Sequence, residues 1–157
     1  MWTRRYRLVA LLVLALCAAT TPPAVPAQTS GQRGARPAPP EVVAELQRSI
    51  ERARQRLEAR DANGVLAYVS EHYRSQGLTK ADVGQQLHAM CTLYEQLRAR
   101  VTIDQARIVD GVVWVYTTGE VSGRLPFVGW VPTLRWTNQP EVARNEGSAW
   151  RLFGFQD

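Results

Sequence analysis

Four side chains have the chemistry needed for proton transfer: Asp104, Glu120, Tyr73 and His72. Asp104 and Glu120 each interrupt a stretch of strand-forming residues. If both side chains pointed into the protein, burial would raise their pKa and suit them to acid–base catalysis. Because successive residues of a strand point to opposite faces, the alternative is that both carboxylates face water. His72 and His88 are interpreted as partly exposed residues on helix faces.

The spacing of histidine, cysteine and acidic residues does not match a metal site. Metal binding requires several ligands that converge at about 2 Å, and the sequence has no His-x-x-x-His pair or closely spaced cysteine pair. We therefore expect neither a metal ion nor another cofactor.

Five aromatic residues form a second group of candidate functional residues: Trp114, Tyr116, Phe127, Trp130 and Trp136. Small-molecule pockets combine aromatic walls with few polar groups, so these side chains could line a pocket for an apolar ligand. They could equally lie in the core, or on a face of the sheet that forms a homodimer. Phe127 and Trp130 lie in a turn-rich segment, where an exposed apolar patch would mark an interaction surface.

Residues 99–123 hold several of these side chains and predict a long β-hairpin. Two stretches rich in strand-forming residues flank Asp110-Gly111, and Asp-Gly favours a type I′ turn because both of its central residues need positive φ. The apolar alternation shifts by one residue at Asp104-Gln105, which predicts a β-bulge. This bulge decides whether Asp104 points toward water or into the protein.

Three helices are predicted before the hairpin. Apolar residues recur every three or four positions over residues 41–60, which indicates an amphipathic helix. Asp61 is the expected N-cap of a short second helix, and Thr79 with Asp82 predicts the capping box of a third. Charges of both signs on the first helix argue against a nucleic-acid surface.

Two further strands are predicted after the hairpin. Residues 131–138 predict a third strand, and residues 148–155 predict a closing strand in which Trp150, Leu152 and Phe155 alternate inward. Between them, residues 140–147 combine a proline with charged residues and predict a turn. Helices followed by antiparallel strands indicate an α+β fold.

The N-terminus, residues 1–27, has the pattern of a signal peptide. Three arginines precede an apolar run that is too short to span a membrane, and Val25-Pro26-Ala27 matches a cleavage site. Residues 28–40 are rich in Pro, Gly, Ser and Gln and predict a disordered linker. We therefore expect an exported domain over residues 41–157, periplasmic or secreted, with no membrane span after signal removal.

The route of export stays open between the general secretory pathway and a twin-arginine signal, which Arg4-Arg5 resembles in part. The segment that ends in Cys17 resembles a lipoprotein box. Leu16 departs from the small residue expected before the lipidated cysteine, so the sequence favours a form without a lipid anchor at Cys17.

Removal of the signal changes the charge and the cysteine content. Three of the 19 basic residues and none of the 14 acidic residues lie in residues 1–27, so the mature chain is close to neutral and its charge does not indicate nucleic-acid binding. Only Cys91 remains, which excludes an intramolecular disulfide. Its apolar helical surroundings predict a buried thiol.

The order of these elements resembles the nuclear transport factor 2-like (NTF2-like) superfamily, which includes ketosteroid isomerase, polyketide cyclases and scytalone dehydratase. The resemblance rests on the long first helix, the turn at residues 61–66, the Tyr73 region, residues 119–123 and residues 149–152. It implies a strongly bent antiparallel sheet wrapped around the helices into a cone-shaped barrel, with a pocket at its open end and a sheet face that often forms a dimer.

The isomerases of this superfamily resemble one another in placing a carboxylate base after the second helix. The matching segment here, residues 70–74, contains no Asp, and Glu71 falls on the face predicted to meet solvent. We therefore expect a non-catalytic exported domain that binds a small apolar ligand or a protein partner through the cone pocket. The alternative is a small isomerase, dehydratase or cyclase, which requires several of the four proton-transfer candidates to converge in one cavity.

Overall fold

The computed structural model describes residues 35–147 and 149–155. The predicted signal peptide and residues 28–34 of the predicted linker lie outside the described residues. The elements are β1 (Arg36–Pro37), α1 (Pro40–Glu58), α2 (Ala62–Leu66), β2 (Arg74–Ser75), β3 (Leu78–Thr79), α3 (Lys80–Leu93), β4 (Gln96–Val109), β5 (Val112–Leu125), β6 (Gly129–Glu146) and β7 (Ala149–Gly154). No helix among the described residues is long and apolar enough to cross a membrane.

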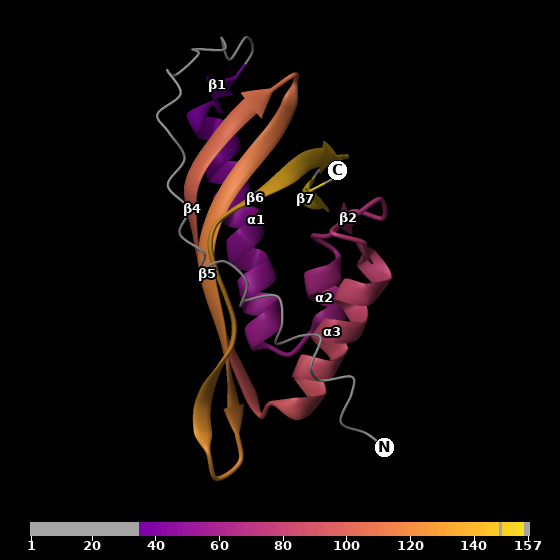
Figure 1. Ribbon diagram of the computed structural model, residues 1–157, viewed down its shortest axis with the longest axis vertical. Coiled ribbons are helices and arrows are strands. Elements are labelled where there is room, and N and C mark those ends of the chain that lie inside the picture. The colour runs from indigo at the N-terminus through magenta and orange to yellow at the C-terminus, as the bar shows by residue number, and fades with distance from the viewer. Residues whose placement is uncertain (1–34, 148, 156–157) are drawn as a thin grey trace, which may run out of the picture. The chain divides into compact units, whose positions relative to one another are not determined.

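Five strands form one antiparallel sheet in the order β1-β4-β5-β6-β7, while β2 and β3 form a separate pair. The main sheet curls into half of a barrel, and the three helices lie against its inner face (Figure 1). The expected α+β fold class with a strongly bent antiparallel sheet is therefore confirmed.

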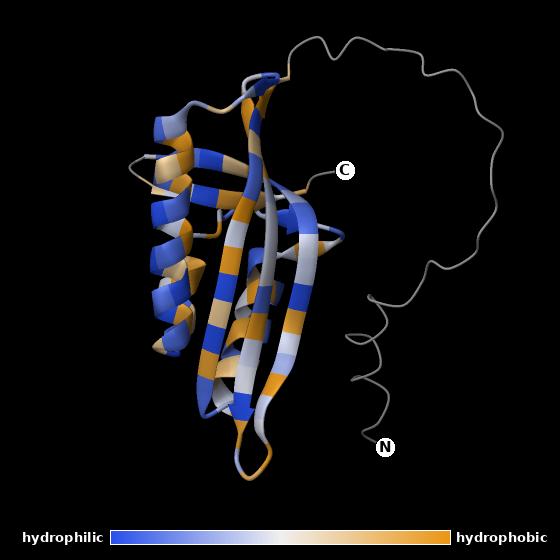
Figure 2. Ribbon diagram, turned by 90° about the vertical axis from the view of Figure 1, so that its left-hand side faces the viewer, coloured by the Kyte–Doolittle hydropathy of each residue, from blue (hydrophilic) through white to orange (hydrophobic). Residues whose placement is uncertain are grey.

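The first helix matches its predicted extent closely. It begins at Pro40, where proline is suited to the first turn because its missing N–H would have no helical partner there. Leu46 and Leu57 are buried against the sheet, and the charged residues face away from it, as the separate blue and orange faces of α1 show in Figure 2. This segregation is the amphipathic pattern that predicted the helix.

Among the described residues, secondary structure begins at β1, earlier than residue 41. Arg36 and Pro37 pair with Ile108 and Arg107 of β4, and the Ala38 N–H donates to the Ala106 carbonyl at 3.0 Å. A Pro-rich composition does not exclude a short edge strand, because an edge strand tolerates proline on its open side.

Both predicted helix caps are confirmed. The Asp61 carboxylate accepts a hydrogen bond from the Gly64 N–H at 2.8 Å at the start of α2. At the start of α3, the Thr79 hydroxyl accepts from the Asp82 N–H at 3.3 Å, and the Asp82 carboxylate accepts from the Thr79 N–H at 2.8 Å. These bonds satisfy backbone donors that have no partner within their helices.

The capping box predicts a measurable contribution to stability. We expect Thr79→Ala to lower the free energy of unfolding by about 1 kcal/mol, because it removes the acceptor for an N-terminal N–H of α3. Thr92→Ala is the matched control, since the Thr92 hydroxyl only donates back to the His88 carbonyl of the same helix. Urea unfolding of both variants measures the difference, and equal losses would contradict the assigned role of Thr79.

The hairpin of β4 and β5 has the predicted turn and the predicted bulge. Asp110 and Gly111 connect the strands with φ values of 51° and 80°, as a type I′ turn requires. Pairing shifts between Ile103 and Gln105, which leaves Asp104 as the extra residue of a bulge.

The predicted turn at residues 140–147 is wrong, because β6 runs without interruption from Gly129 to Glu146. Two features let the strand continue. Asn138 takes a φ of 48° and donates its N–H to the Thr118 hydroxyl at 3.0 Å, which accommodates a register shift. Pro140 lies outside the stretch that pairs with β7. At Pro140, β6 therefore has a neighbouring strand on one side only.

The closing strand is β7, and Phe153 is its most deeply buried aromatic residue.

Candidate functional site

The inner face of the sheet carries two separate apolar clusters. One cluster joins α2, α3 and the end of α1 to the sheet and includes Leu57, Leu87 and Val121; the other packs Leu46 of α1 against Val113, Val115 and Ala143. Between them, the inward positions of β5 and β6 carry polar residues, with Thr117 opposite Gln139 and Glu141 opposite Val115. The core is thus divided by a polar region on its inner face.

Glu141 is the central residue of this polar region. Its strand partner Val115 is only 1% exposed, and burial raises the pKa of the Glu141 carboxyl from 4.5 to about 7. No hydrogen bond or ion pair to this carboxyl occurs within the described part of the chain. Some of the side chain remains accessible to solvent, so a carboxyl that titrates near neutral pH is held on the inner face of the sheet.

The charge of Glu141 affects the pKa of Tyr73. Tyr73 is 9% exposed, and its pKa is raised first by burial and second by the negative charge of Glu141. A hydrogen bond with the Ser75 side chain opposes this rise, and Ser75 is itself buried on β2. Tyr73 is therefore linked to Ser75 by a hydrogen bond and to Glu141 by charge.

Trp136 is the one predicted ligand-binding aromatic residue that faces the same side. Its indole Nε1–H donates to the Thr117 hydroxyl at 3.0 Å, and its ring packs against the first apolar cluster. This bond fixes the ring next to the polar region, because a buried indole N–H needs an acceptor.

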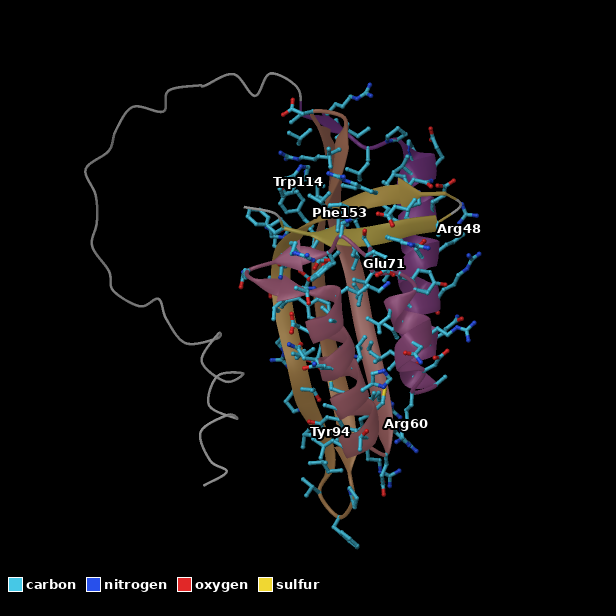
Figure 3. The ribbon with its side chains drawn as sticks, turned by 90° about the vertical axis from the view of Figure 1, so that its right-hand side faces the viewer. Arg48, Arg60, Glu71, Tyr94, Trp114 and Phe153 are labelled. Carbon is cyan, nitrogen blue, oxygen red and sulfur yellow. The ribbon has the colours of Figure 1, made fainter. Side chains whose placement is uncertain are left out.

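The other four predicted aromatic residues do not join it. Trp114 and Tyr116 occupy alternate, outward positions of β5, and the Trp114 ring meets Phe155 edge-on at 5.5 Å between centroids. Trp130 lies under the Arg98 guanidinium at 4.0 Å, and Phe127 is exposed in the loop between β5 and β6. The labelled Trp114 lies toward the opposite end of the domain from Tyr94 (Figure 3).

The four candidates for proton transfer are also separated. Asp104 accepts a hydrogen bond from the Thr118 hydroxyl at 2.6 Å, and Glu120 pairs with Arg135 on the outer face. The Arg135 hydrogen bond, followed by that of Ser122, lowers the pKa of Glu120 below its usual value. His72 lies 6.1 Å from the Phe153 ring, between ring centroids. Of these four residues, only Tyr73 belongs to the polar region around Glu141.

A groove of about 530 Å³ lies elsewhere, at the open edge of β4. It is lined by Arg54, Glu58, residues 96–101 and Trp130. The Glu58 carboxylate accepts the Ala99 N–H at 3.3 Å and pairs with Arg54 at 2.6 Å. Among the described residues, the edge of this half of β4 that faces away from β5 has no strand beside it, since β1 reaches only Arg107 and Ile108.

Glu141 and Ser75 were not identified from the sequence. Residues 139, 141 and 143 do alternate inward, but the proline and charges around them predicted a turn. Ser75 follows no periodic pattern, and only tertiary packing buries it.

Cys91 is buried as predicted, and burial raises the pKa of its thiol. Among the described residues, no group of three or more His, Cys, Asp or Glu side chains could hold a metal ion.

No protein-family model matches this sequence, and no curated protein does. Solved structures do match. Aln2 from a Streptomyces species is 14% identical, with a TM-score of 0.60 over 76% of this chain and 90% of that one. A proposed dehydratase from the NTF2-like family of Streptomyces avermitilis is 11% identical, with a TM-score of 0.57 over 74% of this chain and 94% of that one.

A third match is Bd1075 from Bdellovibrio bacteriovorus, at 16% identity and a TM-score of 0.53. It covers 71% of this chain, which in turn spans only 38% of the length of Bd1075. Likeness at such low identity reports the arrangement of helices and strands, not an activity. Together with the curled sheet and the three helices on its inner face, these matches show that the domain has the NTF2-like fold.

Proposed function

We propose that this chain is an exported, non-catalytic binding domain that holds a small, largely apolar molecule on the inner face of its sheet. The observation that carries this proposal is Glu141, a buried carboxyl with no protein partner among the described residues and a pKa of about 7. A buried polar group without a partner destabilises a fold, which makes Glu141 a candidate for contact with a ligand.

The surroundings of Glu141 suggest the chemistry of the ligand. Apolar clusters lie on both sides of the polar region, and the Trp136 ring is next to it. Below about pH 7 the Glu141 carboxyl is protonated and can donate a hydrogen bond, and the Tyr73 hydroxyl is a second donor. A hydrophobic molecule that carries one carbonyl oxygen would match this set.

A matched pair of ligands tests the proposal. We expect acetonaphthone, an aromatic ketone, to raise the melting temperature more than ethylnaphthalene, which lacks the carbonyl. Because binding needs the protonated carboxyl, the affinity for the ketone should fall about tenfold between pH 6 and pH 8. In Glu141→Gln the amide remains a donor at both pH values, so this pH dependence should disappear.

Glu120→Gln is the matched control, because Glu120 lies on the outer face and pairs with Arg135. Its ketone affinity should follow the wild-type pH dependence. Equal stabilisation by both ligands, or an unchanged pH dependence in Glu141→Gln, would contradict the role of Glu141.

Acid–base catalysis at Glu141 is the second candidate function. A general base works best with a pKa near the working pH, and about 7 meets this condition. The resemblance in fold to a proposed dehydratase is consistent with this second candidate function. Exchange of the ketone's α-hydrogens in deuterated water distinguishes the two functions: exchange that requires Glu141 supports an enzyme, and bound ketone without exchange supports a binding domain.

A further inference from the structure

The turn between β5 and β6 presents apolar side chains to solvent. Phe127 is fully exposed and Val128 is 69% exposed, and Pro126 precedes them. The paired strands project this turn away from the helices as a narrow tip, coloured largely orange in Figure 2. We call residues 125–129 the hairpin tip. Because the hairpin tip protrudes, it is suited to insert into another surface and not to form a pocket for a ligand.

The backbone of the hairpin tip is also in an unfavourable conformation. Phe127 has a φ of 63°, a conformation that glycine adopts freely and that is unfavourable for a bulky side chain. The Val128 N–H donates to the Pro126 carbonyl at 2.8 Å, which tightens the turn around it. A phenylalanine therefore occupies a position where its backbone is strained and its side chain is fully exposed.

Arginines surround the base of the hairpin tip on the outer face of the sheet. Arg124 pairs across the strands with Trp130, and Arg98 stacks on the Trp130 ring at 4.0 Å. Arg124 forms a long ion pair with Glu95, at 4.0 Å, and both side chains are about half exposed.

A further row lies two residues along the strands, where Arg100 and Arg135 stand on either side of Glu120. Four arginines therefore face two carboxylates, and this side of the hairpin carries a net positive charge. An apolar tip next to an aromatic ring that is flanked by arginines is an arrangement found where proteins meet a lipid headgroup layer.

We propose that the hairpin tip inserts into the surface of an anionic membrane. Phe127 and Val128 enter the boundary between headgroups and acyl chains, and the Trp130 ring lies at headgroup level. Arg98 and Arg124 bind lipid phosphates, each basic residue adding attraction to an anionic surface. This role does not depend on ligand binding at Glu141, which lies on the other face of the sheet.

Hydrogen exchange of the full chain, with and without vesicles, tests the proposal locally. With vesicles of phosphatidylcholine and phosphatidylglycerol, we expect exchange of the amides of residues 125–131 to slow about tenfold. Vesicles of phosphatidylcholine alone should give little protection, because the arginines then lack anionic partners. The turn at residues 76–78 is the internal control and should not change. Since the readout is local, vesicle binding by another part of the chain does not imitate it.

Phe127→Gly separates insertion from folding. Glycine relieves the positive φ, so the variant should fold with unchanged or raised stability, while its partition onto anionic vesicles falls about tenfold. Leu78→Ser removes another exposed apolar side chain, on β3, and should partition like the wild type. Unprotected tip amides, or equal partition of Phe127→Gly and the wild type, would overturn the proposal and favour a protein as the partner of the tip.

Discussion

Glu141→Gln is expected to raise the free energy of unfolding at pH 8 by about 3 kcal/mol. The Glu141 pKa is about 7 in the folded protein and 4.5 when unperturbed. Between these values the folded state binds a proton that the unfolded state has lost, so stability falls as pH rises from about 4.5 to 7 and the loss is complete above it. This difference in pKa corresponds to roughly 3 kcal/mol, which glutamine does not incur because it cannot ionise.

Urea unfolding at pH 4.5 and pH 8 measures this effect. The two proteins should have similar stability at the lower pH and diverge at the higher one. Glu120→Gln is the control, because the Glu120 pKa is lowered by Arg135 rather than raised. A wild-type protein whose stability does not decrease relative to Glu141→Gln over this pH range would show that the carboxyl is solvated.

Gly154→Ala is expected to destabilise the protein by at least about 3 kcal/mol. Gly154 ends β7 with a φ of 79°, and a Cβ there would overlap the carbonyl group of Arg74 at the end of the neighbouring β2 strand. Both the backbone conformation and the packing of β2 against β7 would have to change, and backbone atoms cannot move aside as a flexible side chain can.

Gly111→Ala is the matched control for this substitution. Gly111 has nearly the same φ, 80°, but an added Cβ would meet no atom within 4 Å. It should therefore cost only the backbone strain, about 1 kcal/mol. Thermal unfolding of both variants separates the two contributions, and equal losses would mean that contact with Arg74 is unimportant.

Local patterns in the sequence were sufficient to predict most of the fold. Asp110-Gly111 specifies its turn because few other residue pairs accept two positive φ values, and the phase shift at Asp104 directly reports the bulge. Asp61 and Thr79 act on N–H groups within three residues. Local patterns do not predict that β6 continues through Pro140. This continuation depends on which stretch of β6 has a neighbouring strand on both sides. That is a property of the assembled sheet.

The candidate site was harder to predict, because its residues come from distant segments. Tyr73 was selected, but its importance comes from Glu141, 68 residues later, which the predicted turn had placed in solvent. The five aromatic residues alternate between two faces of the sheet, and each bulge changes which face the following residues share. Of the five, only Trp136 therefore faces the inner side, where it bonds to Thr117.

The bond from the Ala99 N–H to Glu58 has a consequence for aggregation. The first half of β4 is an open edge rich in strand-forming residues, and such edges can pair with the same edge of another molecule. Glu58 occupies one of the free amides and places a negative charge beside it. Since Glu58 belongs to α1, this protection exists only while α1 is docked. Intermolecular pairing should therefore start from partly unfolded molecules in which α1 has detached, even when the β4–β5 hairpin is intact.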